Sequence, residues 1–402
     1  MDDDAFLASA RATYVDVNAR TLRWMLARPR RHGAFVDTKV NPITLRDYGP
    51  QDGWRGPDVT FGWIQGRALE AIATHAAFFA AEDPALSADL DTAGRALYGA
   101  LGRLFDAHGH GYFAYDRDLR PVWLDANGVL HVQKPAGDLF TFSDTFVLKG
   151  LVAAARRYAP EEVDRHAANL LRVVAAIEAG RFVSDERQPL DAAARTGIRD
   201  EYGPRMILLG AASMLAALGL ENAASFGRRF IDHVLARHAV GDGALADVPG
   251  EDVSNPGHAM EFVGFGLEWL EGRDDPATVA ALRDVLVASA RIGFHGPGIS
   301  ARVTLSTGEP LTPHCPWWSL PETVRAAALL HRRTGDPAVL AIWRRAHDLF
   351  FAHYWRGEPP LAYQTLTDRG PVDFVPATPD LDPGYHTGLS LLAAIRSMSD
   401  PA

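Results

Sequence analysis

Residues 254–271 read SNPGHAMEFVGFGLEWLE, an apolar segment with helical spacing and two titratable side chains near its start. Asn255 is a good N-cap, and Pro256 suits the first position of a helix. His258 then falls in the first turn, and Glu261 lies one turn later on the same face, ahead of an aromatic stripe. The segment is therefore predicted to be a helix whose polar first turn and later aromatic residues face inward.

A second segment repeats this design. DPGYH at 382–386 offers Asp382 as an N-cap and Pro383 at the first helical position, and it places His386 in the first turn. The positive end of the helix dipole disfavours an imidazolium there, so both histidines are expected to be neutral near physiological pH. A neutral imidazole is what proton abstraction requires.

Helical periodicity broken by Gly, Pro and Asp recurs along the whole chain. Twelve helices are expected, at 4–27, 61–81, 85–107, 143–158, 160–179, 204–219, 222–239, 256–272, 275–293, 319–334, 336–355 and 385–398. Many form pairs joined by short turns such as AEDPAL, YAPEEV and TGDPAV, and helices joined so tightly pack as antiparallel neighbours. Longer connections fall between the pairs, and the one at 108–142 alternates like a β-hairpin.

Six helical hairpins can form two bundles, an open solenoid or a closed ring. The pairs recur at intervals of roughly 50–75 residues, a loose form of a repeat signature. No Ser- or Pro-rich linker lies near the middle of the chain, which favours one closed domain over residues 1–402. The expected fold is all-α, an (α/α)6 barrel of six inner and six outer helices, with the β-hairpin and long loops at the active-site end.

The helices that follow the long connections begin with unusually polar or aromatic residues. They read FGWIQGRALE, FSDTFVLKG, GPRMILLG, NPGHAMEFVGF, PWWSLPETVRAA and DPGYHTGLSLL. The helices that follow the short turns begin with ordinary exposed sequence. In a closed ring the first group would be parallel, with its N-termini at one end, which predicts a polar cup lined by tryptophan.

Composition excludes several classes of protein. The formal net charge of −10 and the absence of a basic cluster argue against a nucleic-acid binder. No apolar run is long enough to cross a bilayer, and the start MDDDAFLAS lacks the regions of a signal peptide. A single cysteine, Cys315, excludes an internal disulfide framework and fits a reducing cytoplasm. A cytoplasmic protein without membrane or nucleic-acid partners is expected, and a homodimer is compatible with the sequence.

These motifs resemble the N-acylglucosamine 2-epimerase family, whose members form a ring of twelve helices. The resemblance runs from about residue 50 to 395 and includes WIQGR at 63–67, HGYFAYDRD at 110–118, FSDTF at 142–146, NPGHAMEF at 255–262, WW followed by Glu322, and GYH at 384–386. Its most specific part is NPGH-x-x-E with WW-x-x-x-E downstream. Members of the family interconvert sugars that are epimeric at C2, or isomerise aldoses to ketoses, through an enediolate. They use neither metal nor nicotinamide.

The resemblance implies a role for five residues. The two acid–base histidines of the family fall on His258 and His386, its arginine on Arg67, and its orienting carboxylates on Glu261 and Glu322. The implied activity is that of a cofactor-independent sugar 2-epimerase with no metal site. One histidine would take the C2 proton of an open-chain sugar, and the other would return a proton to the opposite face.

Five further residues are expected to bind the substrate. Trp63, Trp317 and Trp318 would offer flat faces to the C–H side of a sugar and exclude water, and Asp144 and Arg205 complete the set. The chain departs from the family's isomerase branch at Ile207, where that branch has a histidine. It therefore resembles the N-acylglucosamine epimerase branch more closely, although Gly384 replaces a cysteine of the animal enzymes and EDVS replaces a family arginine before NPGH.

Each residue also has a structural interpretation. Glu322 can complete a capping box with Ser319 or form an exposed ion pair with Arg325. Arg67 can pair with a glutamate one turn on, at Glu70. The polar start of the helix at 143–158 is explained by Ser143 as its N-cap and Asp144 as a first-turn acid. The HGH motif containing His108 and His110 looks like a metal pair but is more often a surface turn.

Other functions remain alternatives. The nearest is an aldose–ketose isomerase on the same fold, with the same base but proton delivery to C1. A glycoside hydrolase on a similar helical ring would need two carboxylates at the glycosidase separation. A non-catalytic scaffold would bind a sugar or a protein without turnover.

Overall fold

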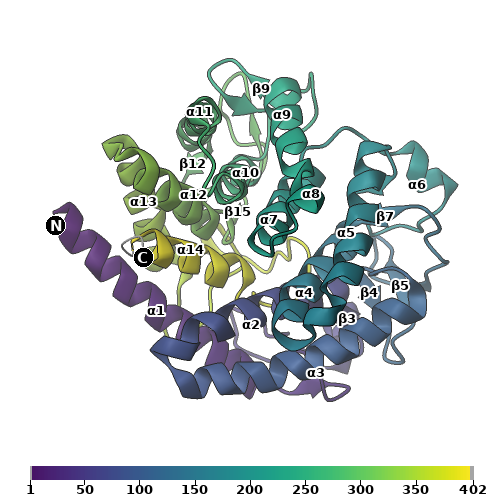
Figure 1. Ribbon diagram of the computed structural model, residues 1–402. Coiled ribbons are helices and arrows are strands. Elements are labelled where there is room, and N and C mark those ends of the chain that lie inside the picture. The colour runs from purple at the N-terminus through teal and green to yellow at the C-terminus, as the bar shows by residue number, and fades with distance from the viewer. Residues whose placement is uncertain (1, 399–402) are drawn as a thin grey trace. The chain divides into compact units, whose positions relative to one another are not determined.

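In the computed structural model, which describes residues 2–398, the chain forms two compact units (Figure 1). Unit 1 contains the residues up to Thr21, residues Glu201–Pro376 and the residues from His386 onward. Unit 2 contains Leu22–Asp200 and Ala377–Tyr385. Helix α1 (Asp3–Ala27) begins in unit 1 and ends in unit 2.

Unit 2 is built on two helical hairpins. Its helices are α2 (Gly62–Glu82), α3 (Pro84–His108), α4 (Phe142–Tyr158), α5 (Val163–Glu178) and the short α6 (Ala192–Thr196), with 3-10 turns at Pro50–Arg55 and Pro160–Glu162. α2 packs on α3, α4 packs on α5, and α2 lies along α4. A Cβ on Gly66 would lie 2.3 Å from the Phe146 carbonyl oxygen, so glycine is required where the two inner helices touch.

Unit 1 contains a row of four helices backed by others. Its elements are α7 (Gly203–Ala217), α8 (Glu221–Ala224), α9 (Phe226–His238), α10 (Pro256–Trp269), α11 (Pro276–Gly293), α12 (Ser319–Thr334), α13 (Pro337–Leu349), a π-helical turn at Phe350–Tyr354, and α14 (Ser390–Ser397). α10 packs between α7 and α12, and α12 packs on α14 (Figure 1). Helices α9, α11 and α13 are the hairpin partners of α7, α10 and α12.

The strands are short and lie in the connections between helices. In unit 2, β1 (Arg30–Arg31) pairs with β2 (Phe35–Val36), β3 (Thr60–Phe61), β4 (Ala114–Tyr115), β5 (Pro121–Leu124) and β6 (Leu130–Val132) form an antiparallel sheet, and β7 (Phe140–Thr141) pairs in parallel with β8 (Phe182–Val183). In unit 1, the pairs are β9 (Ala239–Val240) with β10 (Ala244–Leu245), β11 (Val253–Ser254) with β14 (Val303–Thr304), and β12 (Phe294–His295) with β13 (Gly298–Ile299). β15 (Cys315–Pro316), β16 (Thr365–Thr367) and β17 (Gly370–Pro371) form one small sheet. The predicted hairpin at 108–142 is confirmed by β4, β5 and β6.

All twelve expected helices are present, and Asp-Pro pairs explain many of their starts. The side chains of Asp83, Asp275 and Asp336 cap α3, α11 and α13, and a proline follows each at the first helical position. The predicted helix at 222–239 is two helices, α8 and α9, that meet at Ser225. The helix expected from 385 begins as a π-helical turn, Tyr385–Leu389, and becomes α-helical at Ser390. No helix within residues 2–398 is long and apolar enough to span a bilayer.

Candidate active site

The most tightly held polar group of unit 1 is a histidine–carboxylate pair. His386 Nδ1 lies 2.9 Å from Oε1 of Glu322, in the first turn of α12. Both residues are buried, with exposed fractions of 6% for His386 and 0% for Glu322. When Glu322 is ionised it accepts the hydrogen bond of the His386 Nδ1–H, and this fixes the imidazole tautomer.

A buried arginine holds the other oxygen of the same carboxylate. Arg325 Nη1 lies 3.3 Å from Glu322 Oε2, and the guanidinium packs over the ring of Phe265 on α10 at 4.6 Å. The expected exposed pair of Glu322 and Arg325 is therefore buried, since Arg325 is 2% exposed. A Cβ on Gly264 would lie 3.0 Å from Arg325 Cδ, so the missing side chain makes room for the arginine stem.

The capping-box interpretation of Glu322 is wrong. Trp318 is the N-cap residue of α12, without a side-chain cap, and the hydroxyl of Ser319 donates to the carbonyl oxygen of Pro316 at 2.8 Å. Glu322 faces the imidazole of His386. Glu261 approaches the same ring nitrogen, with Oε1 at 4.0 Å from Nδ1, and is 1% exposed. Two buried carboxylates thus surround one imidazole nitrogen.

Both predicted acid–base histidines contact one tryptophan. The ring centroid of Trp318 lies 5.1 Å from that of His258 and 5.7 Å from that of His386, with interplanar angles of 30° and 36°. Trp317 meets His386 edge-on, with centroids 6.2 Å apart. A Cβ on Gly257 would lie 2.8 Å from Trp318 Cη2, so the glycine of NPGH lets the indole reach α10. The structure therefore brings His258, His386 and both tryptophans together.

The first turn of α10 is fixed by a short chain of hydrogen bonds. The side chain of Asn255 accepts the His258 N–H at 3.1 Å, which confirms the predicted N-cap. The Asn255 N–H donates in turn to Asp247 Oδ1 at 2.7 Å, and Tyr202 donates to the Asn255 carbonyl oxygen at 3.3 Å. His258 itself is half-buried, so its ring keeps access to solvent or substrate.

In unit 2, the predicted arginine lies among aromatic rings. The guanidinium carbon of Arg67 is 4.0 Å from the ring centroid of Phe146, 5.0 Å from that of Trp63 and 5.3 Å from that of Tyr385. Glu70, its suggested partner, lies 3.4 Å from the buried Lys149 ammonium. Lys149 also donates to the Tyr385 hydroxyl at 2.8 Å.

A glutamate that the sequence analysis missed holds Trp63. Glu186 Oε1 accepts the indole N–H of Trp63 at 2.5 Å and the backbone N–H of Ser143 at 3.1 Å. Burial raises the pKa of Glu186 to about 8, because the pocket removes water from its charged form. Glu186 comes from the polar stretch SDERQP, which reads as an exposed loop, so no sequence signal distinguished it from its neighbours.

Asp144 has protein partners on both carboxylate oxygens. Oδ1 accepts the N–H of Gly111 at 2.9 Å and lies 3.1 Å from His110 Nδ1, and Oδ2 accepts the N–H of Thr141 at 3.0 Å. Thr141 is the N-cap of α4, so the assignment of that position to Ser143 is wrong. His110 is buried, not at a surface turn, and its Nε2 contacts the Gly137 carbonyl oxygen at 3.1 Å. These contacts explain His110 as a structural residue.

Arg205 lies in the first turn of α7, and its guanidinium carbon is 5.9 Å from the ring centroid of Phe230 on α9.

The side chains of Glu261, Glu322 and His386 place three potential metal ligands within 4.8 Å of one another. Arg325 already holds Glu322, and a divalent ion bound there would face a guanidinium. This donor set therefore fits a proton-transfer site better than a metal centre.

Residues 237–387 match the family model of N-acylglucosamine 2-epimerase (GlcNAc 2-epimerase). Within these residues the chain is similar to that family. The matched segment contains His258 and His386, whose rings contact Trp318, and the two carboxylates near His386, Glu261 and Glu322. No curated protein matches the chain by sequence.

Three solved structures resemble this chain over almost its whole length. Cellobiose 2-epimerase from Bacillus thermoamylovorans B4167 is 14% identical, with a TM-score of 0.72 and coverage of 98% of this chain and 99% of that chain. A D-mannose isomerase is 12% identical, with a TM-score of 0.71 and coverage of 98% of each chain. Cellobiose 2-epimerase from Spirochaeta thermophila DSM 6192 is 14% identical, with a TM-score of 0.70 and coverage of 97% and 98%. The likeness confirms the predicted fold class, the all-α (α/α)6 barrel.

Proposed function

We propose that this protein is a cofactor-independent sugar 2-epimerase. The observation that carries the proposal is the contact of Trp318 with both His258 and His386, combined with the carboxylate that orients His386. An open-chain sugar held against the Trp318 indole would lie within reach of both imidazoles. The match to the N-acylglucosamine 2-epimerase model supports the same reaction.

The reaction needs only proton transfer. One imidazole removes the proton from C2 of the open-chain sugar, and the electron pair moves into the C1 carbonyl to give an enediolate. The second histidine, in its protonated form, then donates a proton to the opposite face of C2, so no net proton is gained or lost. Each acid–base group contributes roughly 10²–10⁴-fold to the rate. Glu322 stabilises the imidazolium that His386 becomes when it accepts a proton.

The resemblance implies that Glu261 would orient the reacting imidazole. From the sequence itself, Trp63, Trp317 and Arg205 would contact the substrate, whereas Asp144 is 1% exposed and has protein partners on both carboxylate oxygens. Arg67 would stabilise the enediolate oxygen. The cytoplasmic location, the absence of a cofactor and a homodimeric state are proposals of the same kind.

The experiment is solvent exchange at C2. Free mannose, N-acetylmannosamine and cellobiose are incubated in deuterated water, and NMR measures both deuterium at C2 and the products. The true substrate should gain deuterium at C2 and yield its epimer, and His258→Ala and His386→Ala should each abolish the exchange. His353→Ala, which changes an exposed histidine, is the matched control and should keep full activity.

Product identity separates the alternatives. Fructose from mannose would favour the aldose–ketose isomerase, to which the D-mannose isomerase likeness also points at the level of fold. Release of a monosaccharide from a glycoside would favour a hydrolase. Exchange that persists in both histidine variants would overturn the proposed mechanism.

A further inference from the structure

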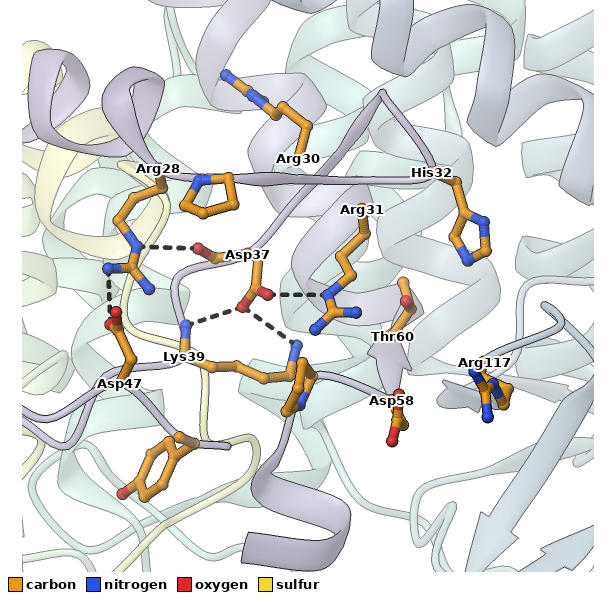
Figure 2. Close-up of a pocket in the computed structure, with 13 residues that line it drawn as sticks. Arg28, Arg30, Arg31, His32, Asp37, Lys39, Asp47, Asp58, Thr60 and Arg117 are labelled. Carbon is orange, nitrogen blue, oxygen red and sulfur yellow. Dashed lines mark hydrogen bonds and ion pairs between the residues drawn. The ribbon is translucent and has the colours of Figure 1, made fainter. Parts of the chain in front are cut away.

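Unit 2 contains a cavity of 510 Å³ that shares no lining residue with the candidate active site (Figure 2). Its wall is formed by the β1–β2 hairpin, the following loop and the residues just before α2. Five cationic side chains line it: Arg28, Arg30, Arg31, Lys39 and Arg117. In a chain with a formal net charge of −10, this concentration of positive charge requires an explanation.

Carboxylates compensate part of this charge. Asp37 accepts from Arg31 Nε at 2.9 Å and lies 3.8 Å from the Lys39 ammonium, which also meets the buried Asp380 at 3.2 Å. Asp47 pairs with Arg28 Nη1 at 2.7 Å. These ion pairs fix one side of the cavity, and Lys39 at 2% exposure cannot turn away from it.

The opposite side presents donors without protein partners. The Arg31 guanidinium pairs with Asp37 through Nε, and no hydrogen bond within residues 2–398 uses its terminal nitrogens. The Arg117 guanidinium has neither a hydrogen-bond nor an ion-pair partner among the same residues. Figure 2 shows Arg31, His32, Thr60 and Arg117 gathered on this side of the cavity, with Asp58 beside them. Two forked guanidinium groups, an imidazole and a hydroxyl therefore converge on one space.

Two backbone and burial features add to this picture. His32 has a φ of +47°, a left-handed conformation that non-glycine residues adopt at the expense of about 1 kcal/mol or more. That conformation lets the hairpin turn while the ring stays beside Arg31 (Figure 2). Arg30 points away from Asp37 in the same view, and its buried Nη1 has no acceptor within the described chain. Its uncompensated charge raises the positive potential of the wall.

We propose that this cavity binds a small phosphorylated sugar. Guanidinium groups suit phosphate oxygens because their planar forks donate pairs of hydrogen bonds, and Arg31 and Arg117 offer two such forks. Thr60 and His32 supply further donors, and the carboxylate of Asp58 accepts from a hydroxyl of the sugar. The volume fits a ligand of this size. The proposal does not depend on the epimerase activity.

The test is calorimetric titration of the full chain with glucose 6-phosphate, inorganic phosphate and glucose. Glucose 6-phosphate should bind most tightly, inorganic phosphate more weakly and glucose not at all. Arg117→Gln and Arg31→Gln should each lower the affinity for glucose 6-phosphate by about tenfold or more, because each removes one guanidinium group that would bind the phosphate. Arg117 has no protein partner within the described chain, so its replacement should leave the melting temperature unchanged.

Arg120→Gln is the matched control. Arg120 is also exposed and lies three residues away, but it pairs with Asp116 and Asp118 and does not line the cavity. Its loss should not alter binding. Equal affinity for glucose and glucose 6-phosphate, or full binding by Arg117→Gln and Arg31→Gln, would overturn the proposal. Equal affinity for inorganic phosphate and glucose 6-phosphate would overturn the assignment of a sugar ester.

Discussion

The buried carboxylate of Glu322 forms an ion pair with Arg325 through one oxygen and contacts the His386 imidazole through the other. Glu322 is 0% exposed. Arg325 offsets part of the electrostatic penalty of burying this carboxylate. The sequence places Glu322 and Arg325 one turn apart on α12 but shows no link to a residue 64 positions later. That link needed the family resemblance.

Glu322→Gln should lower kcat for C2 exchange by about 100-fold, because an amide neither stabilises the imidazolium nor fixes the tautomer of His386. KM should change little, since Glu322 holds the histidine and not the sugar. Steady-state kinetics on the substrate found by solvent exchange measures both constants. Glu268→Gln is the control: Glu268 lies 3.7 Å from Arg325 Nε, and its side chain is 30% exposed. A Glu322→Gln variant with unchanged kcat would contradict the role given to the pair.

At the scale of elements, the approach of α12 to α10 depends on one missing side chain. Gly257→Ala places a methyl group 2.8 Å from the Trp318 indole and 2.9 Å from Ser319 Cβ, so the indole has to move away from His258. The variant should lose most of its C2 exchange, and its melting temperature should fall by a few degrees.

The control for this substitution is Gly102→Ala in α3, where the nearest atom to the new methyl lies 4.0 Å away, at Leu151 Cδ2. Alanine favours a helix over glycine by about 0.5–1 kcal/mol, so this variant should be slightly more stable. If Gly257→Ala behaves like Gly102→Ala in both activity and melting temperature, the contact between α10 and Trp318 is not required.

Helix positions could be predicted well because their signals are local. An aspartate followed by proline at 83, 275 and 336 marks a cap and a first helical residue, whatever the rest of the chain does. The break between α8 and α9, and the π-helical start at Tyr385, arise from packing and left no local signal.

The candidate site was predictable only in part, because some of its contacts have no local signal in the sequence. The NPGH helix and the tryptophan pair carry motifs, and the structure brings them together. The contacts of Trp63 with Glu186 and of Arg325 with Phe265 join segments that are neither adjacent nor periodic. Burial of a charged residue cannot be recognised from its sequence neighbours, so Glu186 was missed and Arg325 was expected at the surface.

For the molecule as a whole, Glu186 makes stability depend on pH. Its ordinary pKa is 4.5, and burial raises it to about 8 in the folded protein. Below pH 4.5 both states hold the proton; as pH rises toward 8 the unfolded state ionises first, so stability is progressively lost over this window. Glu186→Gln stays neutral and should not show this loss.

Melting temperatures at intervals from pH 5 to 8.5 measure the effect. The melting temperature of Glu186→Gln should rise relative to that of the wild type as pH increases. The difference between the two melting temperatures should stop growing above about pH 8, where Glu186 of the wild type is ionised in both the folded and the unfolded state. Asp185→Asn, at the exposed neighbouring position, should follow the wild type throughout. A constant difference between Glu186→Gln and the wild type would show that the carboxyl is already ionised when folded.

Unit 1 is assembled from the two ends and the second half of the chain, and this has a consequence for biosynthesis. Tyr14 of α1 is completely buried and bonds to His347, 333 residues later, and Asn18 bonds to the Gly388 carbonyl oxygen. While the chain emerges from the ribosome, α1 must therefore wait for a partner 333 residues later, whereas most of unit 2 is available from one continuous stretch. A chain interrupted before His386 lacks one of its two proposed acid–base groups.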